Sequence, residues 1–348
     1  MVRVIASSLI FAAICLAGCS GQRGIQAGRD TPCATPPASE KTAKDLQDQN
    51  VPALEGVDVW QNEYGPGLKL VTAHYEIFTT LLEPMTLGRI PLLMESAYRS
   101  YNGQLGEPIE STTRFTIYLF ADRQQWAAFT KGFAGEQAEV FCRIKAGAYC
   151  HNGVCVAYNI GRKRTCSVLG HEGWHQFNSR HFKFRLPSWL DEGVAMLFES
   201  PGAENGTFRF DSSANTYRLD ALKKTLKKNQ MIPLKELVGI NPGEVLATNE
   251  SEAIMAFYSQ SYALVRFLRE GGSGGWQDPY RRLLTDGLKG NWPLDEVSKR
   301  IAQDRNQPRT ILWNRIVGNL LLQQYIGSDL NKLEQEYLAF CREIIKQK

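Results

Sequence analysis

The sequence predicts an α+β protein in which a small mixed sheet with helices is followed by a mostly helical C-terminal lobe. Two observations carry this prediction. Between residues 56 and 205, strand-like alternation of apolar and polar side chains is interspersed with helical segments. From residue 215 onward, nearly every segment has helical periodicity instead. We therefore expect an α/β lobe over residues 56–205 and a helical lobe over residues 206–348.

The first residues of the chain predict export. Arg3 precedes an apolar stretch that is too short to span a bilayer as a mature helix. This stretch ends in Leu16-Ala17-Gly18-Cys19, which resembles a bacterial lipobox, and the resemblance implies cleavage before Cys19 and lipid attachment to it. We expect a lipoprotein signal peptide at 1–18 and a membrane-anchored protein of the cell envelope. Because Ser20 follows the cysteine, outer-membrane delivery is expected in an organism with two membranes.

Residues 19–55 are expected to be the lipidated cysteine and a flexible tether. Polar and small residues dominate this stretch, and Pro36-Pro37 prevents regular structure. A segment this polar cannot bury enough apolar surface to fold alone. Its expected role is to hold the folded body away from the membrane.

Five elements are predicted in the lobe that follows the tether. They are an extended segment at 68–78, a helix at 90–101, a strand at 114–120, a helix capped by Asp122 and a hairpin at 147–160. The extended segment is predicted as one strand because apolar and polar side chains alternate along its length. The hairpin is predicted from Asn152-Gly153, a dipeptide typical of a two-residue turn.

Cysteine usage fits an exported chain. Six cysteines remain after the signal peptide and the lipidated Cys19 are set aside, an even number that predicts up to three disulfides. The hairpin register places Cys150 opposite Cys155, with Cα atoms about 4.5 Å apart, inside the disulfide range. Cys142–Cys166 would close around the hairpin, and Cys33–Cys341 follows by elimination. A second zinc ion held by cysteines is the competing interpretation.

His171-Glu172-Gly173-Trp174-His175 has the spacing of a metal site. On a helix predicted over residues 165–178, His171 and His175 lie on one face and can share one Zn²⁺. Glu172 then lies beside a water molecule whose pKa the ion lowers, which is the minimum requirement for hydrolysing an amide bond. The motif therefore predicts Glu172 as the general base. The alternative is a helix with two ordinary histidines and a surface Glu.

A catalytic zinc normally has three protein ligands, and two residues downstream are candidates for the third. His181 stands where the motif H-E-x-x-H-x-x-G-x-x-H has its last His, although Asn178 replaces the Gly and cationic residues surround His181. Glu192 is the other candidate. Ser188 and Asp191 match a capping box, which assigns Asp191 a structural role and leaves Glu192 available on the same helix.

H-E-x-x-H followed by Trp189-Leu190-Asp191-Glu192-Gly193 resembles the signature of gluzincin zinc metallopeptidases, including their aminopeptidase-N-like branch. Other segments resemble bacterial peptidase-MA-like families of uncharacterised function, namely 68–80, 86–103, 114–131 and 145–198. The resemblance implies a thermolysin-like catalytic core with His171, His175 and Glu192 as the zinc ligands. The G-A-M-E-N exopeptidase motif is absent, so endopeptidase and exopeptidase activity both stay open.

The helical lobe carries one further part of this resemblance. Its helices are expected at 216–228, 251–270, 276–286, 294–302, 310–324 and 328–346. Within the second of these, the segment from Phe257 resembles the form Y-x-K-G, with Gln260 at the Lys position and Ser261 at the Gly position. The resemblance implies that Tyr258 donates a hydrogen bond to the oxyanion. The alternative is that Tyr258 and Tyr262, four residues apart, are an ordinary core pair.

Together these observations predict a lipid-anchored zinc metallopeptidase of the cell envelope, acting on a peptide or protein through attack of zinc-bound water assisted by Glu172. A zinc-stabilised lipoprotein that binds partners without catalysis is the alternative. The 40 basic and 36 acidic residues give a net charge of only +4, which does not indicate nucleic-acid binding. Glu199, seven residues after Glu192 and on the same helix face, is a candidate for orienting a ligand. The sequence does not identify the substrate or the oligomeric state.

Overall fold

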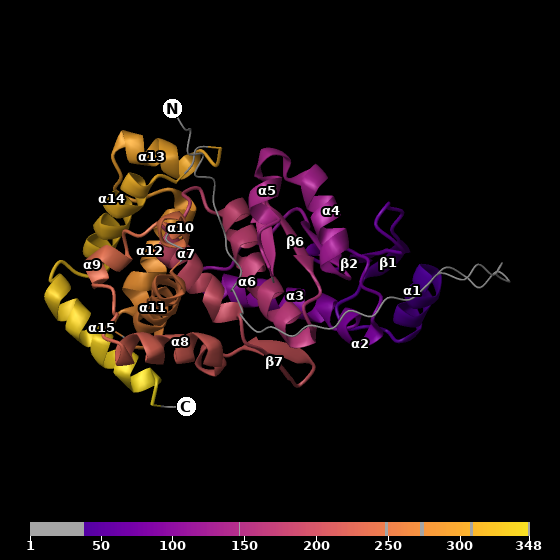
Figure 1. The fold of residues 1–348 in the computed structure, drawn as a ribbon, viewed down its shortest axis with the longest axis horizontal. Helices are drawn as coiled ribbons and strands as arrows, with labels where there is room; N and C mark the ends of the chain where they lie inside the picture. The colour runs from indigo at the N-terminus through magenta and orange to yellow at the C-terminus, as the bar shows by residue number, and fades with distance from the viewer. Residues whose placement is uncertain (1–37, 146, 248–249, 272–274, 307–308, 347–348) are drawn as a thin grey trace. The chain divides into compact units, whose positions relative to one another are not determined.

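The computed structural model describes residues 38–346 except 146, 248–249, 272–274 and 307–308 (Figure 1). The predicted signal peptide, the lipid anchor at Cys19 and the first part of the tether lie outside the described residues. The rest of the predicted tether is not a flexible segment, because residues 38–48 form a helix that packs beside the first strand and buries Leu46. Within the described part of the chain, no helix is both long enough and apolar enough to span a bilayer.

The described chain divides into two compact units that interleave along the sequence. The sheet unit takes residues 38–95 and 113–168, and the helical unit takes residues 96–112 and those from 169 onward. This division differs from the predicted lobes, because the helices that carry the metal motif pack with the C-terminal helices. In particular, α7 (Ser188–Ala195) packs along α11 (Ser251–Glu270).

The sheet unit contains a six-stranded mixed sheet, as the α+β prediction required. Its strands are β1 (Gly56–Val59), β2 (Leu68–Val71), β3 (Tyr75–Thr79), β4 (Phe115–Phe120), β5 (Ala148–His151) and β6 (Val154–Tyr158). Their order is β1-β2-β3-β4-β6-β5, with β3, β4 and β6 parallel and the other neighbours antiparallel. Such a mixed sheet joins hairpins at its edges to parallel crossovers at its centre.

The prediction of a single strand over residues 68–78 was wrong, since the chain turns back between β2 and β3. The turn is held by Glu95, whose carboxylate accepts hydrogen bonds from the Thr72 hydroxyl (2.7 Å) and the His74 amide (2.8 Å). Buried side chains alternate in each strand, but the phase shifts across the turn, from Leu68 and Leu70 in β2 to Tyr75 and Ile77 in β3. This shift of phase is a signal of the turn that the prediction missed.

The helices of the sheet unit are α1 (Ala38–Asp48), α2 (Pro84–Leu87), α4 (Arg123–Phe133) and α5 (Ala138–Phe141). Two further helices begin in this unit and end in the helical unit, namely α3 (Ile90–Asn102) and α6 (Arg162–His181). Asp122 caps α4 as predicted, accepting from the amides of Gln124 and Gln125. Figure 1 shows α4 beside β6, and there the Trp126 indole donates to the carbonyl of Val156.

The predicted hairpin register is confirmed. Cys150 pairs directly with Cys155, and Asn152 and Gly153 both have positive φ, at 51° and 74°, as a type I′ turn requires. A disulfide between these two cysteines stays a prediction. The structure contains no Cys142–Cys166 disulfide, and Cys33, the suggested partner of Cys341, lies outside the described residues.

The helical unit is built around α11, which packs against α7, α8, α12 and α15 (Figure 1). Its other helices are α8 (Thr216–Lys227), α9 (Leu234–Leu237), α10 (Pro242–Ala247), α12 (Gln277–Lys289), α13 (Glu296–Gln303), α14 (Ile311–Leu321) and α15 (Leu330–Ile344). The predicted helical C-terminal part is therefore confirmed. A short hairpin of β7 (Pro201–Glu204) and β8 (Thr207–Phe210) was not predicted, although Asn205-Gly206 at its turn is a typical signal.

Close packing of α7 on α11 depends on Gly193. A Cβ atom there would lie 2.5 Å from Val265 Cγ2 and 2.6 Å from the Ser261 carbonyl oxygen. We expect Gly193→Ala to lower the free energy of unfolding by about 1–3 kcal/mol, because the two helices must separate. Gly132→Ala in α4 is the control, since its Cβ would meet nothing within 4 Å. Urea unfolding of both variants tests this, and equal effects would contradict the packing argument.

Candidate metal centre

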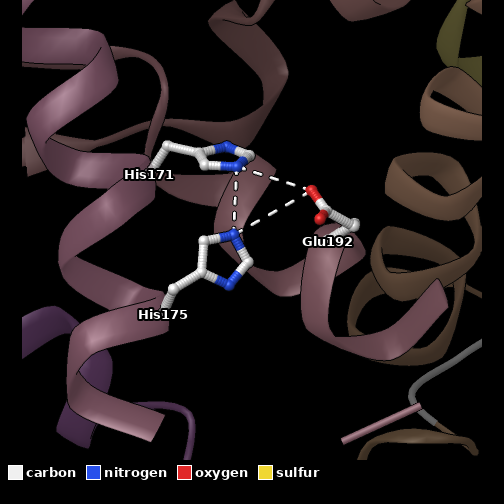
Figure 2. A group of neighbouring side chains, drawn as sticks. All are labelled: His171, His175 and Glu192. Atoms are coloured by element: carbon white, nitrogen blue, oxygen red, sulfur yellow. Dashed lines mark hydrogen bonds and ion pairs between the residues drawn. The ribbon is translucent and has the colours of Figure 1, made fainter. Parts of the chain in front are cut away.

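His171, His175 and Glu192 converge at one point in the helical unit. Figure 2 shows the two imidazoles on α6 and the carboxylate on α7 pointing toward one another. The two Nε2 atoms are 3.2 Å apart, and Glu192 Oε2 lies 3.5 Å from His171 Nε2 and 3.9 Å from His175 Nε2. All three residues are buried. The fold thus brings together the three ligands predicted from sequence.

These distances fit a metal ion. A tetrahedral ion with ligand bonds of about 2.0–2.2 Å separates its ligand atoms by about 3.3–3.6 Å. The observed separations of 3.2, 3.5 and 3.9 Å surround that range. The group can therefore hold a metal ion with little rearrangement, and its geometry alone does not specify which metal.

The other ring nitrogens of the histidines define how the rings are protonated. His171 Nδ1 lies 3.0 Å from Glu199 Oε1, and His175 Nδ1 lies 2.8 Å from Asp191 Oδ1. An ionised carboxylate only accepts hydrogen bonds, so both Nδ1 atoms carry a proton, and each Nε2 faces the centre, where its lone pair is available to a metal ion once the nitrogen is deprotonated. Glu199 therefore orients a histidine of the cluster, as its position after Glu192 predicted.

The capping box predicted at Ser188 and Asp191 is wrong. The N-cap of α7 is Pro187, which makes no side-chain capping hydrogen bond. Asn314 of α14 takes that role instead: its Oδ1 accepts from the Ser188 amide, and its Nδ2 donates to the Ser188 hydroxyl. The Asp191 carboxylate faces His175. The two neighbouring acids of α7 thus serve the same centre, one directly and one through a histidine.

Glu199 is fixed by two further residues that the sequence did not reveal. The Arg218 guanidinium donates to both of its oxygens, at 2.8 Å from Nε and 2.6 Å from Nη2. Asn215 Nδ2 donates to Glu199 Oε2 at 2.9 Å, and the Asn215 side chain also caps α8. The Arg218 guanidinium lowers the pKa of Glu199 far below its usual range, despite the opposing effect of burial. Glu199 is therefore an ionised and immobile acceptor.

Asp191 is also held by an amide and a guanidinium, but its contact with the guanidinium is longer than that of Glu199. Asn178 Nδ2 donates to its Oδ1 at 2.6 Å, and Arg309 Nη1 lies 3.3 Å from its Oδ2. Burial would raise the pKa of Asp191, but His175 and Arg309 lower it to about 2. Asn178 stands at the Gly position of the longer zinc motif, and here it supports the partner of His175.

The net charge of the centre favours binding of a divalent cation. Four carboxylates lie in or directly behind the cluster, and two guanidiniums pair with them: Glu172, Asp191, Glu192 and Glu199, with Arg218 and Arg309. With all four carboxylates ionised and both histidines neutral, as metal ligands are, these charges leave two negative charges in a largely buried site. Burial of uncompensated charge is costly, and a dication would remove that cost. Although burial alone would lower it, the carboxylates of Glu192 and Glu199 raise the pKa of His171 to about 10.

Glu172 lies beside this cluster with its charge unpartnered. It has no exposed surface, and neither carboxylate oxygen has a hydrogen-bond partner among the described residues. Burial raises the pKa of Glu172 to about 7, against the opposing effect of His171 and His175. A carboxyl group whose pKa is close to neutral can both accept and return a proton.

Tyr258 is also brought to the site. It lies on α11, is buried, and its hydroxyl has no hydrogen-bond partner among the described residues. Its ring centroid lies 5.4 Å from the guanidinium carbon of Arg218, the residue that holds Glu199. Burial raises the pKa of Tyr258 well above its usual value, so the phenol stays protonated and can donate. Tyr262 instead donates to the carbonyl of Ser212.

His181 is not part of the cluster formed by the described residues. It is the last residue of α6, and its ring packs on Phe177 with centroids 4.7 Å apart. Burial and the neighbouring Arg180 lower the pKa of His181 to about 4, so its ring is neutral near pH 7. Of the two candidates for the third ligand, the structure brings Glu192 to the other two.

No protein-family model and no curated protein matches this chain. The resemblance to gluzincins therefore rests on the sequence motifs alone. The metal-binding capacity of the cluster rests on the distances, burial and charges described above.

Proposed function

We propose that the protein is a zinc metallopeptidase of the gluzincin type, with a thermolysin-like core, that hydrolyses peptide bonds. The main support is a three-residue ligand cluster with an unpartnered buried carboxylate, Glu172, directly beside it. A purely structural metal site needs no general base, and an unpaired buried carboxylate destabilises the fold. Its presence favours catalysis over the alternative of a zinc-stabilised lipoprotein without activity.

Zinc is the metal that this ligand set suits best. Two imidazoles and one carboxylate form a three-ligand set, the number that leaves one position open in catalytic zinc sites. Imidazole ligands favour zinc and its neighbours over magnesium or calcium, which prefer oxygen ligands. Both histidines are also held by carboxylates through Nδ1, an arrangement common around zinc.

Each residue then has a defined task. A bound zinc ion would act as a Lewis acid on the substrate carbonyl and would lower the pKa of a water molecule. Glu172 would accept the proton of the attacking water and later deliver it to the leaving nitrogen. The Tyr258 hydroxyl would donate a hydrogen bond to the oxygen that becomes negatively charged. Asp191 and Glu199 keep both Nε2 lone pairs directed at the metal.

The proposed location follows from the N-terminal sequence. A lipid anchor at Cys19 and the polar residues between it and α1 would hold the peptidase at a membrane of the cell envelope, where its substrate would be a peptide or protein. Nucleic acid is not a proposed partner.

The test is a metal and activity measurement on the mature chain. We expect about one zinc per chain by elemental analysis, and cleavage of a quenched-fluorescent peptide library that a chelator abolishes and added zinc restores. Magnesium and calcium serve as controls and should not restore activity. A chain that binds no zinc contradicts the proposal as a whole. Zinc binding without cleavage of any library member would favour the non-catalytic alternative.

A further inference from the structure

Arg218 contacts two parts of the centre that are separate in the sequence. It lies on α8, is 4 % exposed, and holds Glu199 with two short hydrogen bonds. Its guanidinium carbon also lies 5.4 Å from the centroid of the Tyr258 ring on α11. We propose that Arg218 is a positioning residue that sets Glu199 and Tyr258 in a fixed relation, and so links metal binding to stabilisation of the oxyanion. This inference rests on the proposed function.

The hydrogen bonds of the Arg218 guanidinium explain its expected effect on metal binding. Two donors in one plane match the two oxygens of a carboxylate, which fixes both the position and the rotation of Glu199. That carboxylate in turn accepts from His171 Nδ1 at 3.0 Å. Removing one partner of a buried ion pair leaves the other uncompensated, so loss of Arg218 disturbs Glu199 and, through it, His171.

The contact of the Arg218 guanidinium with the Tyr258 ring explains its expected effect on the position of Tyr258. The Tyr258 hydroxyl has no hydrogen-bond partner among the described residues, so contacts of the ring must define its orientation. A cation against an aromatic face is attractive, and a planar guanidinium can offer its face to a ring while its edge binds a carboxylate. The ammonium group of lysine cannot make both contacts in this way. The two contacts together therefore suit arginine better than lysine.

The second arginine of the centre provides a contrast. Arg309 makes one contact of 3.3 Å with Asp191 and donates to the carbonyl of Leu186. Arg218 instead has two hydrogen bonds to one carboxylate, and two tyrosine rings lie beside its guanidinium carbon. The outer ring is that of Tyr217, which is 40 % exposed and has its centroid 5.2 Å from the same guanidinium carbon. Tyr217→Ala therefore removes a contact of Arg218 without touching Glu199 or Tyr258.

The experiment compares Arg218→Lys with the wild type, with Tyr217→Ala as the control. Zinc affinity is measured by competition with a chromogenic chelator, and kcat and KM are measured at saturating zinc. We expect Arg218→Lys to lower zinc affinity by about 10- to 100-fold. We also expect kcat to fall by about 10-fold with little change in KM, because an interaction of the transition state is lost. Tyr217→Ala should leave zinc affinity unchanged.

A double-mutant cycle separates the two roles of Arg218. Tyr258→Phe is expected to keep zinc affinity and to lower kcat by about 10²–10³-fold. If Arg218 positions Tyr258, Arg218→Lys costs little further kcat in the Tyr258→Phe background. Additive losses would overturn the link to Tyr258, and unchanged zinc affinity in Arg218→Lys would overturn the link to the metal. Should Arg218→Lys not fold, the neutral pair Arg218→Gln with Glu199→Gln replaces it in the cycle.

Failure of the peptidase proposal is distinguishable from failure of this one. Zinc affinity is read without any substrate, so the metal side is decided even if the wild type cleaves nothing. In that case the tyrosine side is decided by NMR of tyrosine-labelled protein, in which the Tyr258 signal is identified by its loss in Tyr258→Phe. That signal should shift in Arg218→Lys, and an unshifted signal overturns the link.

Discussion

Glu172→Gln is expected to lower kcat/KM for peptide hydrolysis by about 10²–10⁴-fold while zinc remains bound. Gln occupies nearly the same volume as Glu but cannot accept a proton from water. Glu172 is not one of the three residues in the ligand cluster, so the zinc content should stay close to that of the wild type. Both quantities are measured on the same preparation, by elemental analysis and by initial rates at saturating zinc.

Glu236→Gln is the matched control for this substitution. Glu236 is exposed on α9 in the same unit, so its amide variant should keep full activity. A Glu172→Gln protein that cleaves peptides at the wild-type rate would remove Glu172 from the mechanism. A variant that loses its zinc as well would instead show that Glu172 helps to hold the metal.

Losing a side chain that only hydrogen-bonds to a metal ligand typically lowers metal affinity by about 10- to 100-fold. Glu192→Ala is expected to lower zinc affinity by more than this. In the proposed site the Glu192 carboxylate is the third ligand, and its Oε2 lies 3.5 Å and 3.9 Å from the two Nε2 atoms. Its negative charge also attracts the positive ion. His181→Ala should bind zinc as the wild type does, because His181 is outside the cluster. Chelator competition on both variants measures the difference. The reverse result would assign the third ligand to His181.

The parts of the fold that could be predicted from sequence are those with strong local signals. Helix α11 was predicted over residues 251–270, which are its observed bounds, because its apolar periodicity is long and uninterrupted. The β5–β6 hairpin was found from Asn152-Gly153, a dipeptide that favours positive φ. The turn between β2 and β3 was missed although the buried positions shift phase there, and the side chain that stabilises it, Glu95, comes from a distant helix.

The candidate site could likewise be predicted only in part from the sequence. Spacing identified His171 and His175, the capping argument and the gluzincin resemblance pointed to Glu192, and the structure brings the three together. The argument that freed Glu192 was nevertheless wrong in detail, since Asp191 binds His175 rather than capping α7. Arg218 and Arg309 were missed because no periodicity or motif connects them to their partners. Arg309 is 118 residues from the aspartate that it contacts.

That separation also determines when the three-residue cluster can form. In an unfolded chain His171 and His175 are close in sequence, but the packing of α7 on α11 and the contact from Arg309 that complete the centre are absent. The three side chains acquire their geometry only after most of the polypeptide has folded, so binding of a metal ion there would be a late event in folding. In the exported peptidase proposed above, hydrolytic activity would thereby be withheld during transit, when nearby unfolded chains are most easily cut.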